Sequence, residues 1–255
     1  MVRVLHPIPV EQLKLLVFDL DGTLIDSQID LANSINAMLA HLGKPELPHA
    51  VLLGYIGDGA TLLVRRALGD PEGDVHDERY VNEALEYFLA HYRVHKLDFT
   101  YVYAGVAEAL AAVRAEWPGI AMAVLTNKPV GVSREICAHF GLDRFFFQVY
   151  GGNSFHTKKP DPAGLLALMA EASALDGADA AAAGTHSAAA PIAPAGTVMI
   201  GDSEVDIMTA RNCGARSIGC SYGLSPQSLA AAPPDALVAS PAELPAALRR
   251  VAELR

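Results

Sequence analysis

The chain has 255 residues, of which 51% are apolar, and its 19 basic and 29 acidic side chains give a net charge of −10. This length allows one or two domains with a substantial core, and the acidic balance without a basic cluster argues against a nucleic-acid-binding module. Three sparse cysteines without metal-ligand spacing predict free thiols in a reducing cytoplasm. Residues 1–11 lack signal-peptide features and no apolar run reaches membrane-spanning length, so we expect a cytoplasmic protein without a membrane partner.

The first predicted element is a strand that starts near Lys14, after an irregular lead-in over residues 1–13. Its short apolar run predicts a buried strand in a parallel sheet, and it ends abruptly at Asp19, Asp21 and Gly22. Side chains two apart on a strand point the same way, so both carboxylates would face one point at its carboxyl end. Ligands bind at that edge in open α/β sheets, although an Asp-Gly turn without a function is the alternative.

Residues 26–100 are predicted to be helical. Apolar side chains recur at helical spacing over residues 29–42, and further helices are expected over about 59–67 and 77–95. No strong strand is predicted in this stretch. It therefore reads as a helical insertion between the first strand and the next.

From residue 104 onward, predicted helices and strands alternate. The strands fall at residues 120–125, 145–150, 197–200 and 215–219, and the helices at 104–116, 130–140, 161–172, 204–212 and 243–254. Strict alternation predicts right-handed βαβ units, and hence an α/β fold with a Rossmann-like, three-layer parallel-sheet core. Residues 173–196, rich in Ala, Gly, Ser and Pro, read as a mobile surface insertion outside any site.

Polar clusters follow three of the predicted strands. They are Asp19-Leu-Asp21, Thr126-Asn127 and Gly201-Asp202-Ser-Glu-Val-Asp206. Parallel strands end at one edge of a sheet, so the three clusters should converge on a single site. Taken alone, Asp202 would also serve as a helix N-cap.

Together with Lys159, in Lys158-Lys-Pro-Asp-Pro162, these clusters resemble the four motifs of the haloacid dehalogenase superfamily, whose members are mostly phosphatases. The resemblance spans residues 15–206 in the family order. It implies that Asp19 is the nucleophile that forms an aspartyl-phosphate, and that Asp21 is first the general acid and then the general base.

The resemblance also assigns the residues that hold the phosphoryl group. They would be Thr126, Asn127 and Lys159. Lys158 is an adjacent rival, but the family pattern places the lysine directly before the proline. Haloacid dehalogenases proper lack the acid at the position of Asp21, so its presence favours phosphoryl transfer over dehalogenation.

A divalent cation is implied by the same resemblance. Mg²⁺ would bind an oxygen of Asp19, the backbone carbonyl of Asp21 and the carboxylate of Asp202, while Asp206 would hold Lys159 or a metal-bound water. Mg²⁺ favours few carboxylates together with water and phosphate oxygens, which suits this set. The cation and the ammonium would offset the charge of a phosphate dianion.

The insertion at residues 25–100 resembles the superfamily's helical cap domain, which leaves residues 1–24 and 101–255 as the core domain. Within it, residues 26–30 and 54–66 resemble the phosphoglycolate phosphatases of this superfamily. Gly57 and Gly59 would let backbone amides approach a small carboxylate, and Arg65 would pair with it. A loop that merely starts a helix, with Arg65 solvated, fits the pattern equally well.

The sequence therefore predicts a Mg²⁺-dependent phosphatase for a small phosphorylated acid, 2-phosphoglycolate first, acting as a monomer or homodimer. A sugar-phosphate phosphatase or a β-phosphoglucomutase-like phosphotransferase on the same scaffold is the alternative. A non-catalytic binding protein comes third, because both catalytic carboxylates, Asp19 and Asp21, are present.

Overall fold

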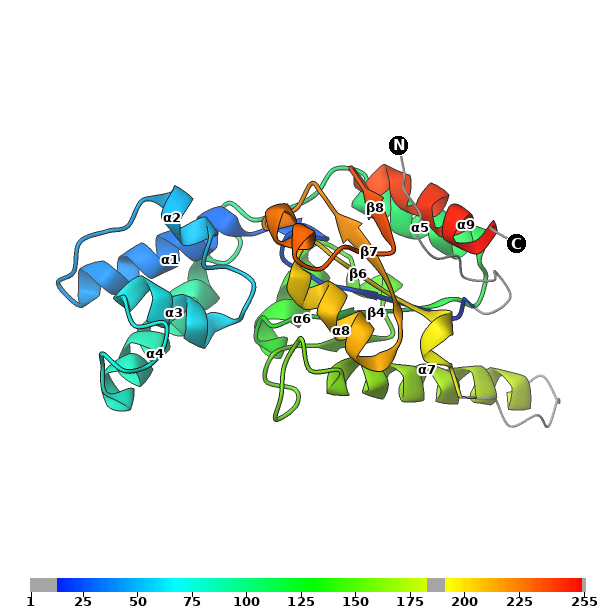
Figure 1. Ribbon diagram of the computed structural model, residues 1–255, viewed down its shortest axis with the longest axis horizontal. Helices are drawn as coiled ribbons and strands as arrows, with labels where there is room; N and C mark the ends of the chain where they lie inside the picture. Colours follow the sequence, from blue (N-terminus) through cyan, green and yellow to red (C-terminus); the bar gives the residue numbers. More distant parts are fainter. Residues whose placement is uncertain (1–12, 183–190, 254–255) are drawn as a thin grey trace.

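The computed structural model describes residues 13–182 and 191–253 (Figure 1). The predicted lead-in, apart from residue 13, therefore lies outside the described residues. So does the middle of the Ala-rich segment, residues 183–190.

A parallel sheet forms the centre of the structure, with the strand order β5-β4-β1-β6-β7-β8. Its strands are β1 (Leu15–Phe18), β4 (Ala121–Leu125), β5 (Gln148–Tyr150), β6 (Thr197–Gly201), β7 (Arg216–Cys220) and β8 (Ala236–Val238). Strand β1 is fully buried in the middle, where Leu15 pairs with Ala121 on one side and Thr197 on the other. The predicted parallel α/β core is thus confirmed; β8, a three-residue edge strand, is too short to stand out in the sequence.

Helices cover both faces of this sheet (Figure 1). Leu15 and Val17 of β1 belong to the core cluster packed by α7 (Ala163–Ala182), whereas Leu16 and Phe18 belong to the cluster on the other face. The remaining core helices are α5 (Val106–Glu116), α6 (Val130–His139), α8 (Glu204–Cys213) and α9 (Leu244–Glu253). Short 3₁₀ turns occur at η2 (Asp143–Phe145), η3 (Pro194–Gly196), η4 (Pro226–Ala230) and η5 (Pro241–Glu243). The alternation along β1 is what makes the core three-layered.

A group of helices lies beyond the carboxyl end of β1, at the left of Figure 1. They are α1 (Gln28–His41), α2 (His49–Leu53), α3 (Ala60–Leu68) and α4 (Glu78–His95). Two short antiparallel strands, β2 (Ile25–Asp26) and β3 (Tyr101–Val102), join this group to the core. The helices predicted from spacing are confirmed, whereas α2 and the two-stranded ribbon are too short to show a period.

The Ala-rich segment differs from its prediction. Helix α7 continues to Ala182, so the interpretation of residues 173–196 as a surface insertion is wrong for its first part. Alanine is the best helix former, and its density outweighs the glycine in that stretch. At the far end, Ile192 is buried against α7, and its backbone N–H donates to Ser173 Oγ at 2.8 Å. Part of the segment therefore belongs to the core.

Two features concern the chain as a whole. Cys137, Cys213 and Cys220 are free, and the first and last of them are buried. Among the described residues, none of the helices combines the length and the apolar character needed to cross a membrane.

Candidate active site

The carboxyl ends of β1, β4 and β6 bring the predicted motifs around one cavity, which encloses about 650 Å³ including its open mouth. The predicted residues in its wall are Asp19, Asp21, Gly57, Gly59, Thr126, Asn127 and Asp202. The cavity lies between the core and the helices of residues 28–95, because Leu63 of α3 and Phe88 of α4 also line it. The convergence follows from the parallel sheet, in which these three strands are neighbours.

Asp19 follows the last residue of β1 and is held from several sides. Its backbone N–H donates to the Ile200 carbonyl of β6 at 2.8 Å, and its Oδ1 accepts from the Leu20 N–H at 2.7 Å. Lys159 Nζ lies 2.9 Å from the same Oδ1. Burial raises the pKa of Asp19 to about 6, against the opposing effect of the Lys159 ammonium. This carboxylate is thus buried, oriented and paired with a cation.

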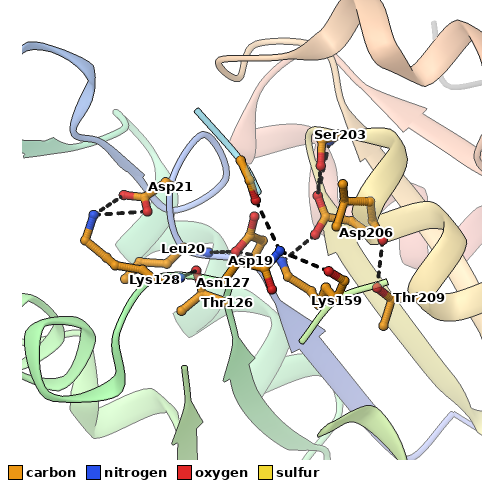
Figure 2. Close-up of polar contacts among 12 residues, drawn as sticks. Asp19, Leu20, Asp21, Thr126, Asn127, Lys128, Lys159, Ser203, Asp206 and Thr209 are labelled. Carbon is orange, nitrogen blue, oxygen red and sulfur yellow. Dashed lines mark hydrogen bonds and ion pairs between the residues drawn. The ribbon is translucent and has the colours of Figure 1, made fainter. Parts of the chain in front are cut away.

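Lys159 bridges two carboxylates, as Figure 2 shows. Its ammonium donates to Asp206 Oδ1 at 2.6 Å as well as approaching Asp19, and its side chain is 2% exposed. Burial alone would lower the pKa of Lys159, but Asp19 and Asp206 together raise it above its ordinary value. Lys158 is instead exposed and donates to the Asp58 carbonyl of the helical group. The structure therefore brings Lys159, and not its neighbour, into contact with Asp19.

Three carboxylates form an acidic cluster whose oxygens lie within 4.8 Å of one another: Asp19, Asp202 and Asp206. Burial, and then the charges of Asp206 and Asp19, raise the pKa of Asp202 to about 8. Gly22, at φ 83°, packs so tightly here that an added Cβ would lie 2.2 Å from Asp202 Oδ2. Clustered buried carboxylates repel one another, and a divalent cation offsets that repulsion.

The remaining oxygens of this cluster differ in their partners. Asp206 Oδ2 accepts from the Ser203 N–H at 3.1 Å and from the Ser203 hydroxyl at 2.8 Å, so both Asp206 oxygens already have protein donors. Ser203, and not Asp202, stands at the N-terminus of α8, which corrects the N-cap interpretation of Asp202. Asp19 and Asp202 are therefore the carboxylates better placed to hold a cation.

Asp21 takes a different direction from Asp19. Strand β1 ends at Phe18, so the alternation that would align the two carboxylates does not persist, and each pairs with its own lysine. Lys128 Nζ lies 2.9 and 3.0 Å from the two oxygens of Asp21 (Figure 2). Ser27 Oγ donates to the same carboxylate. Asp21 lines the cavity beside the acidic cluster and is not part of it.

Lys128 is a site residue that sequence reasoning missed. Its side chain is 3% exposed and its Nζ stands 4.6 Å from the ring centre of Tyr92, a buried residue of α4. Burial alone would lower the pKa of Lys128, but Asp21 and Tyr92 raise it above its ordinary value. Its position two residues after Thr126 was the available signal, because the carboxyl end of β4 contributes to the cavity.

Thr126 and Asn127 follow β4, and Asn127 connects the core to the helical group. Thr126 Oγ1 accepts from the Lys128 N–H at 3.3 Å. Asn127 Nδ2 donates to the Gly57 carbonyl at 3.2 Å and to the Lys159 carbonyl at 3.1 Å. The Asn127 Oδ1 atom is buried without a hydrogen-bond partner among the described residues. Asn127 thus links the end of β4 to the segments that contain Gly57 and Lys159, and its side-chain oxygen can still accept a hydrogen bond.

Arg65 lies away from the cavity. One nitrogen of its guanidinium is 2.9 Å from Asp70 Oδ2, and another contacts Glu78. Arg65 does not line the cavity, so its placement contradicts the prediction that it pairs with a substrate carboxylate. Its side chain is 12% exposed, which also corrects the alternative of a solvated arginine. The orientation of α3 turns this residue toward the start of α4.

Comparison with known proteins decides the family. Residues 16–220 match the family described as haloacid dehalogenase-like hydrolase. The chain belongs to this family. It is therefore an enzyme, a hydrolase, and its four motifs lie at one sheet edge.

Individual relatives of this haloacid dehalogenase-like hydrolase support the same family assignment. The phosphoglycolate phosphatase of Cereibacter sphaeroides (strain ATCC 17029 / ATH 2.4.9) is 35% identical over 235 residues, which cover 92% of this chain and 97% of that protein. The phosphoglycolate phosphatase of Pseudomonas syringae pv. syringae (strain B728a) is 36% identical over 211 residues, covering 82% and 70%. The crystal structure of a predicted phosphoglycolate phosphatase from Haemophilus somnus 129PT superposes with a TM-score of 0.76 at 30% identity, covering 92% and 97%.

Proposed function

We propose that this hydrolase is a Mg²⁺-dependent phosphatase that cleaves 2-phosphoglycolate into glycolate and phosphate. Its class, a phosphomonoester hydrolase, follows from the family match and from the named phosphatases it resembles. The observation that carries the proposal is the buried Asp19, paired with Lys159 and opening into a cavity whose wall also contains Asp21. This arrangement supplies a nucleophile, a cation and a second carboxylate for proton transfer.

In the proposed reaction, a carboxylate oxygen of Asp19 attacks phosphorus and the bond from phosphorus to the ester oxygen breaks. Asp21 donates a proton to the departing glycolate oxygen, and the product is an aspartyl-phosphate on Asp19. Asp21, now a carboxylate, takes a proton from water as that water attacks phosphorus. Phosphate leaves and Asp19 is regenerated. Lys159, Thr126 and Asn127 would bind the phosphoryl oxygens throughout.

The residues present fit a divalent cation. Asp19 and Asp202, with the backbone carbonyl of Asp21, would hold Mg²⁺, while Asp206 remains with Lys159 and Ser203. Hard oxygen donors of this kind, few in number, are the set that Mg²⁺ binds together with water and phosphate. When bound, the cation supplies positive charge that offsets the repulsion between a phosphate dianion and the carboxylates.

We further propose that residues 25–100 act as a cap domain over a core formed by residues 1–24 and 101–255. Two contacts support this: Asn127 donates to the Gly57 carbonyl, and Lys158 donates to the Asp58 carbonyl. The β2 and β3 ribbon is the double connection through which such a cap would move. Closure would exclude water from the reacting groups.

A substrate panel tests the function. Phosphate release should be measured with 2-phosphoglycolate, glucose 6-phosphate, β-glucose 1-phosphate and p-nitrophenyl phosphate, with Mg²⁺ and with excess chelator. We expect the highest kcat/KM for 2-phosphoglycolate and no turnover in chelator. Conversion of β-glucose 1-phosphate into glucose 6-phosphate without phosphate release would identify a phosphotransferase instead. Full activity in chelator would exclude the metal.

Metal-dependent stability should depend on pH. In the metal-free protein, the raised pKa of Asp202, about 8 against 3.8 in the unfolded chain, means that the folded state binds more protons between these values. Stability from this group therefore falls as pH rises from about 4 to about 8. Bound Mg²⁺ removes that loss of stability. Adding Mg²⁺ at pH 9 should therefore raise Tm by roughly 3 °C or more beyond the increase that Mg²⁺ produces at pH 6. Asp202→Asn should abolish the difference, and a Mg²⁺ effect independent of pH would contradict it.

A further inference from the structure

Lys128 and Tyr92 form a buried pair in the cavity wall, with the Lys128 Nζ 4.6 Å from the ring centre of Tyr92. Among the described residues that line the cavity, Lys128 is the only one with a basic side chain. Lys159 does not line the cavity and contacts Asp19 and Asp206, and Arg65 lies outside the wall and contacts Asp70 and Glu78. Lys128 is in the wall itself, where it shares its ammonium with Asp21. An anionic leaving group that enters this cavity therefore meets Lys128.

We infer that Lys128 and Tyr92 form the subsite that recognises a carboxylate on the carbon bearing the phosphate ester. This inference rests on the proposed function and names the residues that set its substrate class. The partners of that carboxylate would be Lys128 of the core and Tyr92 of α4, and not Arg65.

The position of Lys128 beside Asp21 restricts where the substrate charge can lie. Lys128 Nζ is 2.9 and 3.0 Å from the Asp21 oxygens, and Asp21 is the group that would protonate the ester oxygen. A hydrogen bond from the Asp21 carboxyl group to the ester oxygen would place these two oxygen atoms about 2.7 Å apart. In a 2-phospho acid, the carboxylate carbon is two bonds from the ester oxygen. Its oxygens therefore fall within reach of the same ammonium.

Tyr92 supplies a second donor. Its side chain is 2% exposed, it lines the cavity, and its hydroxyl has no hydrogen-bond partner among the described residues. Burial raises the pKa of Tyr92 to about 12, so the hydroxyl keeps its proton. A buried donor without a partner is costly, and a substrate carboxylate would satisfy it. Because Tyr92 comes from α4 and Lys128 from the core, one carboxylate would join the helical group to the core.

The rest of the wall opposes larger polar leaving groups. The helical group contributes apolar side chains there, namely Leu31, Ile56, Leu63, Phe88 and Leu89. A sugar placed against them would bury hydroxyl groups without partners, which costs binding free energy. A two-carbon acid leaves these side chains in contact with its methylene group alone. The lining and the Lys128–Tyr92 pair therefore favour the same small substrate.

The test compares two substrates of equal length, 2-phosphoglycolate and 2-hydroxyethyl phosphate, which lacks the carboxylate. In the Mg²⁺-loaded enzyme, Lys128→Met should reduce kcat/KM for 2-phosphoglycolate about a hundredfold more than for 2-hydroxyethyl phosphate, because the bound carboxylate loses its cation. Tyr92→Phe should reduce the same ratio about tenfold. Lys128→Arg should keep most of the preference. Lys44→Met, which removes a cation near Tyr80 outside the cavity wall, should leave the ratio unchanged.

A binding measurement separates recognition from catalysis. Calorimetric Kd values for 3-phosphonopropionate, an uncleavable analogue of 2-phosphoglycolate, and for propylphosphonate should differ widely in the natural enzyme and little in Lys128→Met. Equal losses on both ligands or both substrates would mean that Lys128 acts through Asp21 and would overturn the inference. An unchanged ratio would overturn it as well. Failure of the proposed function looks different, because the unmodified enzyme would then show no preference for 2-phosphoglycolate.

Discussion

Asp19→Asn is expected to reduce turnover by a factor on the order of 10⁴ or more, to the background rate, in a protein that stays folded. The amide keeps the shape of the side chain and can still accept from the Leu20 N–H, which now bonds Asp19 Oδ1 at 2.7 Å. It lacks the negative charge that attacks phosphorus, so the bond to phosphorus does not form. The measurement is phosphate release from 2-phosphoglycolate at saturating Mg²⁺, with circular dichroism to show that the fold is intact.

Two controls sharpen this result. Asp143→Asn changes an exposed carboxylate of η2 that does not line the cavity, and it should leave turnover unchanged. Rapid acid quenching after mixing with labelled 2-phosphoglycolate should recover protein-bound phosphate from the unmodified enzyme and none from Asp19→Asn. Substantial phosphatase activity in the folded variant would remove Asp19 from the role of nucleophile.

The convergence of Asp19, Thr126 and Asp202 could be predicted because it depends on short patterns and one topological rule. Each residue follows a short apolar strand, and parallel strands end at the same edge. Lys159 has no such strand before it. Its assignment needed the family resemblance, and the structure shows it buried between Asp19 and Asp206.

Lys128 could not be identified in this way, because its surroundings come from a distant part of the chain. A lysine that follows a strand is ordinarily solvated. Here the ring of Tyr92, on α4, covers it and Asp21 pairs with it. Neither contact has a signature in the residues next to Lys128. The Asp21 contact depends on how the ends of β1 and β4 meet in the core, and the Tyr92 contact on how α4 packs against the core.

The error over Arg65 has a related cause. Helical periodicity predicted α3 correctly, but it does not say toward which neighbour each polar side of a helix turns. That direction depends on Asp70 and Glu78, which follow α3 and hold the guanidinium. The loop between α3 and α4 has no periodic pattern, and its ability to bind an arginine was therefore invisible in the sequence.

Lys159→Met is expected to lower the free energy of unfolding by about 3–5 kcal/mol in metal-free protein, because it leaves buried carboxylates without their cation. Lys159 is the ammonium that contacts both Asp19 and Asp206, and Asp202 lies in the same cluster. Denaturant unfolding in excess chelator measures the loss. Lys158→Met is the matched control. Lys158 is exposed and donates to the Asp58 carbonyl, so its loss should change stability little.

If repulsion among the buried carboxylates causes the loss of stability in Lys159→Met, three further results should follow. The destabilisation should be smaller at pH 5 than at pH 8, because protonation of the carboxylates relieves the repulsion that Lys159 now offsets. Adding Mg²⁺ should restore part of the lost stability, since a cation held by Asp19 and Asp202 neutralises the same cluster. Asp206→Asn in the same chain should restore part of it without metal. A loss that is independent of pH, metal and Asp206 would show instead that the variant is destabilised by packing of the methionine, and that the ammonium is not what allows these carboxylates to be buried together.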